Sequence, residues 1–149
     1  MSLEDDIRQQ KFNSEHQKAA INILYTGSWV YSRNAARLKK HDVTPEQYNV
    51  LRILRGSHPA KLMLAEITSR MIDKSSNATR LVEKLRQKGF VKRELCESNR
   101  RQVDISITDK GIGLMKQIDL EEGEWVETLK NLSKIEASEL NRLLDKLRG

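Results

Sequence analysis

Residues 75–84 contain six polar side chains of types that can contact a nucleic acid: Ser75, Ser76, Asn77, Thr79, Arg80 and Lys84. Hydroxyl and amide groups exchange hydrogen bonds with base edges in the major groove, and the methyl group of a threonine can touch a thymine. The guanidinium of Arg80 can pair with guanine or with a phosphate, and the amine of Lys84 can neutralise a phosphate. The alternative interpretation is ordinary helix-start chemistry, because serine and asparagine favour the first turn of any helix.

A second basic signal lies in the polar run of residues 97–102, which contains Arg100 next to Arg101. Two exposed arginines in such a turn contribute little to folding. A narrow minor groove of DNA has an enhanced negative potential that attracts inserted arginine side chains. We therefore predict that Arg100 and Arg101 contact a minor groove, and the alternative is a basic loop that meets only solvent.

The charge of the chain gathers in this same region. The protein has 149 residues, with 27 Lys and Arg against 21 Asp and Glu, which gives a net charge of +6. Residues 71–103 hold nine bases and four acids, whereas the rest of the chain is close to neutral. A local surplus of this kind predicts a surface for a polyanion, although basic residues can also simply solvate a helix. Residues 119–127 hold five acids and no base, so we expect them to avoid a phosphate backbone.

The other reactive residue types form no catalytic or metal-binding pattern. The one cysteine, Cys96, excludes a disulfide within the chain and lacks the flanking cations that mark a reactive thiol. The three histidines are far apart and lack the spacing of metal ligands. No catalytic triad, carboxylate pair or glycine-rich phosphate loop is present. We therefore expect no enzymatic activity, no metal and no cofactor.

The length and hydropathy of the chain predict one domain in the cytoplasm. A chain of 149 residues buries a core of ordinary domain size. No apolar run approaches the roughly 18 residues that a membrane span needs. Residues 1–6 are polar and acidic, unlike a secretory signal.

The helices that must position these side chains are predicted from apolar periodicity and caps. Apolar residues at steps of three and four predict helices over residues 15–38, 64–71, 74–88 and 109–131. Thr44, Pro45 and Gln47 form the start of a further helix, which Gly56 ends, and Ser133 with Glu136 forms a capping box for a last helix. Asp73 is the expected N-cap of helix 74–88, and Gly89 its expected end.

A β-hairpin is predicted directly after helix 74–88. Residues 91–95 and 103–107 alternate in polarity around the polar turn at 97–102. A short helix, a tight link, a capped polar helix and a basic hairpin follow one another in the order of a helix-turn-helix with a wing. In such a unit the second helix enters the major groove.

These segments resemble the MarR-type transcriptional regulators. Residues 64–67 (LAEI) and 74–85 (KSSNATRLVEKL) are similar to the helix-turn-helix of that family, and residues 89–93 and 107–111 are similar to the segments that enter and leave its wing. Residues 44–48 resemble the start of its second helix, and Leu132-Ser133 the start of its last. The family wing commonly carries an acid two residues before its tip arginine, which here matches Arg101, but this chain has Asn99 there. The usual ion pair cannot form, so we expect a looser wing.

The resemblance implies a mainly α-helical fold with a small β-hairpin wing, in a single domain over residues 1–149. A winged helix-turn-helix would span about 44–110, and N- and C-terminal dimerisation helices would span about 1–40 and 112–149. The resemblance further implies a homodimer that binds a pseudo-palindromic operator in double-stranded DNA, often as a repressor released by a small-molecule effector. The alternative is a winged-helix protein-interaction module whose basic face meets an acidic protein without specific DNA binding.

Apolar residues near both chain ends support a dimer, because the domain core cannot obviously cover them: Ile7, Phe12, Leu140, Leu143, Leu144 and Leu147. A two-fold dimer would place two recognition helices about 34 Å apart, one turn of DNA. The alternative is a last helix that folds back on its own domain.

Aromatic residues of the first two helices could line an apolar ligand pocket, or could be plain core or dimer contacts: Tyr25, Trp29, Tyr31 and Tyr48.

Overall fold

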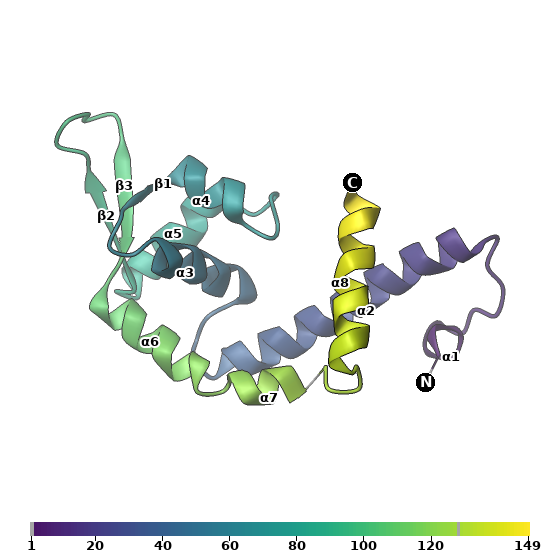
Figure 1. Ribbon diagram of the computed structural model, residues 1–149. Coiled ribbons are helices and arrows are strands. Elements are labelled where there is room, and N and C mark those ends of the chain that lie inside the picture. The colour runs from purple at the N-terminus through teal and green to yellow at the C-terminus, as the bar shows by residue number, and fades with distance from the viewer. Residues whose placement is uncertain (1, 128) are drawn as a thin grey trace.

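The computed structural model describes residues 2–127 and 129–149 and is mainly α-helical, as the sequence predicts (Figure 1). A small antiparallel sheet with the strand order β1-β3-β2 accompanies the helices. The elements are α1 (Leu3–Ile7), α2 (Glu15–Lys39), α3 (Pro45–Ser57), β1 (Leu62–Met63), α4 (Leu64–Arg70), α5 (Ala78–Gln87), β2 (Val91–Leu95), β3 (Val103–Ile107), α6 (Asp109–Asp119), α7 (Glu122–Glu127) and α8 (Lys134–Arg148).

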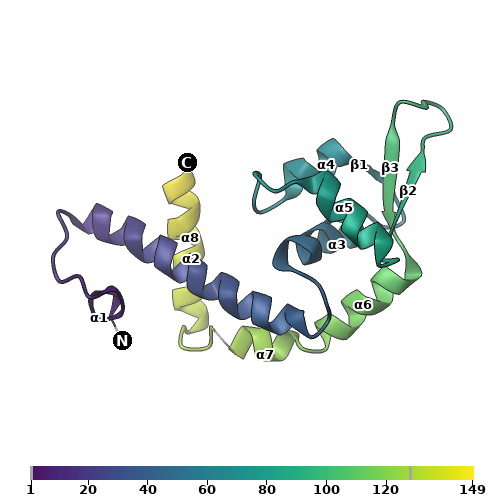
Figure 2. The ribbon, with the colours of Figure 1, turned by 180° about the vertical axis from the view of Figure 1, so that it is seen from behind.

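The chain forms two regions of different shape (Figures 1 and 2). The head, residues 43–119, is a packed unit of α3 to α6 with the sheet. The arm consists of residues 2–39 and the described residues from 122 onward, and it extends away from the head along α2. The segment predicted as a winged helix-turn-helix, about residues 44–110, lies within the head.

The head holds the hydrophobic core. Val50, Leu51 and Leu54 of α3 are at most 1% exposed, and they share one cluster with the buried residues of α4, α5, α6 and the sheet. Full burial of one such side chain stabilises a fold by about 1.5–3 kcal/mol. Two glycines permit the close packing at the edge of this core. Gly89 ends α5 with φ +81°, and a Cβ atom on Gly111 would lie 2.3 Å from the carbonyl oxygen of Phe90.

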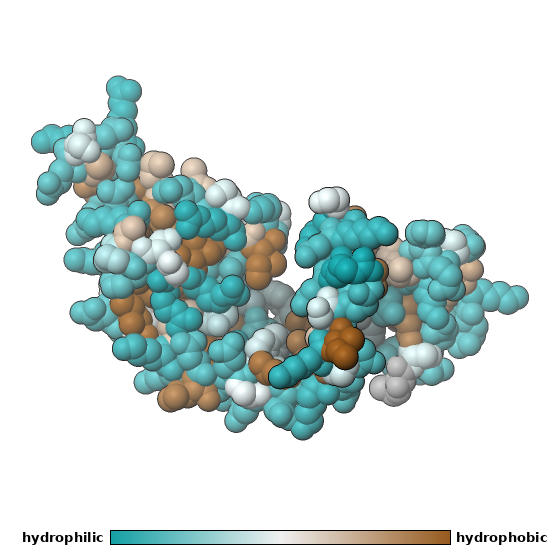
Figure 3. Space-filling view, in the orientation of Figure 1, coloured by the Kyte–Doolittle hydropathy of each residue, from teal (hydrophilic) through white to brown (hydrophobic). Residues whose placement is uncertain are grey.

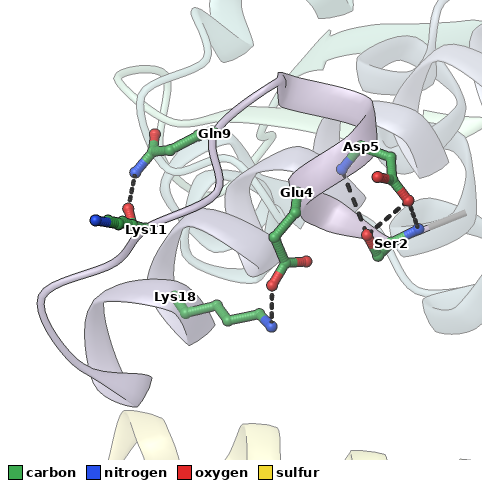
Figure 4. A network of polar contacts seen from close by, with 6 residues as sticks. All are labelled: Ser2, Glu4, Asp5, Gln9, Lys11 and Lys18. Carbon is green, nitrogen blue, oxygen red and sulfur yellow. Dashed lines mark hydrogen bonds and ion pairs between the residues drawn. The ribbon is translucent and has the colours of Figure 1, made fainter.

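Many apolar side chains of the arm are exposed, although Leu38 at the end of α2 is completely buried in the core of the head. Helix α8 has no buried residue, and Leu24 of α2 is 75% exposed. Short α1 is held against α2 by an ion pair between Glu4 and Lys18 and is capped by Ser2 (Figure 4). A single copy of the chain therefore leaves the arm without a core.

The predicted N-caps of α3 and α8 are confirmed. Thr44 caps α3, and its Oγ1 accepts a hydrogen bond from the Gln47 backbone N–H at 3.1 Å, while the Gln47 side chain accepts from the Thr44 N–H. Ser133 and Glu136 form the same arrangement at α8. The predicted end of α3 at Gly56 is wrong by one residue, since the helix continues to Ser57.

The predicted helix 74–88 begins four residues later than expected. The Asp73 carboxylate does not cap it, because this group accepts hydrogen bonds from the Ser75 backbone N–H at 2.9 Å and from the Ser75 hydroxyl at 2.6 Å. These bonds close a local turn instead of a helix start. Asn77 is the true N-cap, and its Oδ1 accepts from the Arg80 N–H at 3.0 Å.

The predicted helix 109–131 is interrupted. It ends at Asp119 and resumes at Glu122, residues 129–131 form a turn, and residue 128 lies outside the described residues. The reason is that the apolar residues of this segment lie in two different regions, the head and the arm. Met115 and Ile118 are completely buried in the head, whereas Val126 is 58% exposed in the arm. Strand β1 was not predicted, because two residues are too few to show a period.

Candidate nucleic-acid interface

Helix α5 presents one face to the core and the others to solvent. Ala78, Val82 and Leu85 are at most 6% exposed, and they fix the helix against α3 and α4. The predicted contact residues Thr79, Arg80 and Lys84 are exposed on the remaining faces. The β2–β3 hairpin projects beyond this helix, with hydrophilic residues covering its tip at the upper left of the space-filling view (Figure 3).

The link between α4 and α5 is ordered by two side chains. Asn49 of α3 is 7% exposed, and its Oδ1 accepts a hydrogen bond from the Ile72 backbone N–H at 2.9 Å. Hydrogen bonds from Ser75 lower the pKa of Asp73, so its carboxylate stays ionised at neutral pH. Ser75 lies exposed in this link and Ser76 is half-buried there, so both precede the helix on which they were predicted.

The hairpin tip is held through Asn99. Its Oδ1 accepts a hydrogen bond from the backbone N–H of Arg101 at 3.1 Å, and its carbonyl oxygen accepts from the Gln102 N–H at 2.9 Å. The side chain of Gln102 donates to Asp104 at 2.8 Å. Asn99 thus closes the turn through the backbone, and the side chains of Arg100 and Arg101 remain exposed.

Several bases around α5 and the hairpin lack a protein partner. Within the described residues, no ion pair or side-chain hydrogen bond is formed by Arg80, Lys84, Arg93, Arg100 or Arg101. Neighbouring bases differ, since Arg86 pairs with Glu83 at 2.8 Å and Lys61 with Glu94 at 2.8 Å. The unpaired cations are therefore available to an anion from outside the chain.

A hollow of about 440 Å³ lies between α5 and the hairpin. It brings Thr79 of α5 and Arg101 of the hairpin tip to one surface. Arg93, one of the nine bases of residues 71–103, also lines it, although it was not predicted to contact DNA. The sequence does contain a sign of this role. Arg93 lies on the same side of its strand as Val91 and Leu95, and an arginine is unusual among residues that face a core.

Two adjoining pockets of about 320 and 470 Å³ lie between α2 and the head, and both are lined by Tyr48 and Arg52. Tyr31 lines the smaller one, as predicted, and donates a hydrogen bond to Glu46 at 2.7 Å. Tyr25 and Trp29 do not line either pocket. They lie on outward faces of α2, 38% and 37% exposed. Two of the four aromatic residues that were predicted to line a pocket therefore do so, and the other two do not.

Other chemistry is scarce in the part of the chain that the structure describes. No group of three or more His, Cys, Asp or Glu side chains there could hold a metal ion. None of the helices described is long and apolar enough to cross a membrane. The Ser98 hydroxyl lies 3.2 Å from the Cys96 sulfur, and its hydrogen bond lowers the pKa of the thiol.

Comparison with known proteins places these features in a family. The model of the MarR family matches residues 43–103, which include the helix-turn-helix, β2 and the hairpin turn and end at the first residue of β3. The HTH-type transcriptional regulator MgrA of Staphylococcus aureus is 31% identical over 109 residues, which are 73% of this chain and 72% of MgrA. The regulator YkoM of Bacillus subtilis is 33% identical over 104 residues, which are 67% of this chain and 66% of YkoM.

Solved structures agree on the fold. A MarR-like transcription regulator from Bacillus cereus superposes with a TM-score of 0.80 at 21% identity, covering 89% of this chain and 95% of that one. A mutant of S. aureus MepR bound to an oligodeoxyribonucleotide has a TM-score of 0.59 at 21% identity, covering 87% of this chain and 94% of MepR. The similarity therefore extends beyond the head to most of the arm.

Proposed function

The chain belongs to the MarR family of transcriptional regulators, and from this premise we propose that it is a homodimeric repressor of a pseudo-palindromic operator. Proteins of this family are regulators of transcription and not enzymes. The partner we propose is double-stranded DNA, and regulation of transcription would place the protein in the cytoplasm.

The observation that carries the proposal is the set of unpaired bases on α5 and the hairpin, of which Arg93 and Arg101 line the hollow beside α5. We propose that α5 enters the major groove, where Asn77, Thr79 and Arg80 meet base edges. The Asn77 oxygen is used as a helix cap, so its amide N–H groups are the ones available to a base. Ser75 and Ser76 would contact DNA from the link, Lys84 would contact a phosphate, and Arg100 and Arg101 would enter the minor groove.

The exposed apolar side chains of the arm support a second copy of the chain as the partner in a dimer. Leu140, Leu143 and Leu147 of α8 are 44%, 48% and 66% exposed, whereas Leu144 and, near the chain start, Ile7 and Phe12 are half-buried. Soluble proteins rarely leave such a surface uncovered. A two-fold axis through the arms would present both α5 helices to one side of a duplex.

The pockets between α2 and the head support release by a small-molecule effector. They lie where a ligand would contact both regions, and the larger one is lined by Arg37, Arg52, Arg55 and the ring of Trp125. A ligand that binds one head-to-arm arrangement better than another shifts the population of the DNA-binding form.

The salt dependence of binding to duplex DNA tests the proposed function. Lys84, Arg80, Arg100 and Arg101 from two protomers would release up to about eight counterions, which predicts a log–log slope of roughly −7. A slope near zero, together with binding to acidic proteins, would overturn the proposal and favour the protein-interaction module. An assay by fluorescence anisotropy at several salt concentrations gives this slope directly.

A further inference from the structure

The head and the arm meet where α6 gives way to α7, and an acid on each side of Leu120 pairs with a distant base. Asp119 accepts two hydrogen bonds from the Arg55 guanidinium of α3, at 2.6 and 3.3 Å. Leu120 itself is 88% exposed, so no apolar packing fixes the chain at this point. We call residues 119–121 the junction.

Glu121 ties the junction to the end of α2. One of its oxygens lies 3.0 Å from the Lys40 amine, and both lie 3.2 Å from Nε2 of His41. The side chains of His41 and Glu121 are 13% and 22% exposed, so water screens this pair less than a surface pair. The Lys40 and His41 hydrogen bonds lower the pKa of the Glu121 carboxyl, which keeps it charged.

Arg37 adds a third contact at the same place. Its guanidinium lies 5.6 Å from the centre of the Tyr48 ring on α3 and 5.1 Å from that of Trp125 on α7. Its Nη2 donates to Asn34 at 3.1 Å. Arg37 of α2 therefore contacts both α3 of the head and α7 of the arm, and these cation–π contacts add to the burial of Leu38 of α2 in the core of the head.

We propose that Asp119 and Glu121 are positioning residues that fix the head on the arm and thereby set the separation of the two α5 helices. This inference rests on the proposed function, because it needs a dimer built through the arms. Helix α6 moves with the head, since Met115 and Ile118 are completely buried there. A change of angle at the junction then moves each α5 helix relative to the two-fold axis. Half-sites are read about 34–36 Å apart, and one added base pair shifts a half-site by about 3.4 Å and 35°.

A distance measurement in the free protein tests the inference. Cys96 in the hairpin is the one cysteine of the sequence, so a nitroxide label on it gives a single label per protomer and one label-to-label distance in a dimer. Electron–electron double resonance should give a narrow distance distribution for the wild type. Asp119→Asn with Glu121→Gln should broaden it by about twofold, because two of the contacts that oppose rotation are lost.

The matched control is Glu127→Gln, which removes one carboxylate from α7. Its ion-pair partner Lys130 lies three residues further along the same segment, so this pair does not join head to arm. The distribution of this variant should stay narrow. Exchange of the first pair, Arg55→Asp with Asp119→Arg, should keep it narrow as well. An unchanged width in the Asp119→Asn, Glu121→Gln protein would overturn the inference.

Operator spacing gives a second readout that general destabilisation would not move. The ratio of affinities for an operator with native spacing and one with an added base pair should fall about threefold to fivefold in the double variant. Affinity for a single half-site should not change. If the wild type shows neither a label-to-label distance nor a spacing preference, the proposed function fails and this inference with it. If the wild type shows both and the double variant retains them, the inference alone fails.

Discussion

The head and the arm use the same apolar residue types in opposite ways. In the head, leucines such as Leu51, Leu54 and Leu85 are at most 1% exposed, and Leu95 of the hairpin is an exposed exception. In the arm, Leu24 and Leu147 are 75% and 66% exposed, although both lie on well-formed helices. The difference indicates that the head is complete in one chain, whereas the arm requires a partner surface to bury its apolar side chains.

The largest expected effect comes from a deletion in the head core. Leu54→Ala should lower the free energy of unfolding by about 2–5 kcal/mol, because it removes buried methyl groups and leaves a cavity. Leu147→Ala in the arm is the matched control and should cost the monomer much less. Urea denaturation at low protein concentration measures both, and equal losses would contradict the division into head and arm.

A smaller effect is expected when the arm surface is made polar. Leu140→Ser with Leu143→Ser changes four side chains in a dimer, and half of each is exposed in the single chain. At about 25 cal/mol per Å² of apolar surface buried, we expect dimerisation to weaken by about a hundredfold. Sedimentation velocity measures this change. Leu95→Ser, at a hairpin leucine that is 65% exposed, should leave the dimer intact, and the opposite result would place the interface on the head.

Base reading by the head is expected to depend on α5. Arg80→Ala should weaken operator binding by about 1–3 kcal/mol and relax the sequence preference at the contacted base pair. Arg86→Ala on the same helix is the control, because Glu83 already occupies that guanidinium at 2.8 Å. Competition binding with operator variants measures the preference. If Arg86→Ala has the larger effect, α5 is turned relative to our proposal.

Contacts between the head and DNA phosphates should appear in the salt dependence of the DNA-binding affinity. Lys84→Ala should reduce the log–log salt slope by about one for each protomer while leaving the order of preferred sequences unchanged. Lys116→Ala, which removes an exposed base of α6 far from α5 in sequence, should leave the slope as it is. An unchanged slope for Lys84→Ala removes this residue from the contact surface.

The smallest expected effect concerns the pH dependence of stability at the junction. The pKa of Glu121 is lowered below its ordinary value of 4.5 in the folded protein, chiefly by the Lys40 hydrogen bond. The unfolded state then binds more protons, so the contribution of Glu121 is present above pH 4.5 and is lost as the pH falls through the folded pKa. Glu121→Gln should flatten this part of the urea-denaturation profile, whereas Glu124→Gln on an exposed face of α7 should not.

Local signals in the sequence were sufficient for much of the head. Thr44 and Gln47 determine the start of α3 through bonds within one turn, and Gly89 ends the predicted helix with a positive φ. The hairpin bounds at 91–95 and 103–107 follow from strict alternation and match the strands. Each of these features depends on residues that are neighbours in the sequence.

Features that depend on distant contacts were not predictable in the same way. The choice of Asn77 over Asp73 as the cap of α5 depends on the link, whose Ile72 N–H is held by Asn49 from another helix. Strand β1 exists because Leu62 pairs with Ile105, more than 40 residues away. For the candidate site, the residue types were evident from the sequence, but the hollow that joins Thr79, Arg93 and Arg101 required the packed head.

Selection of bound sequences from a pool of random duplex DNA tests the central claim most directly. A dimer of heads held on paired arms predicts an enriched pseudo-palindromic consensus whose half-site centres are about 10 base pairs apart. Such a result would show sequence preference and two-fold symmetry together. Recovery of sequences without a consensus, or of a consensus with a single half-site, would contradict the account.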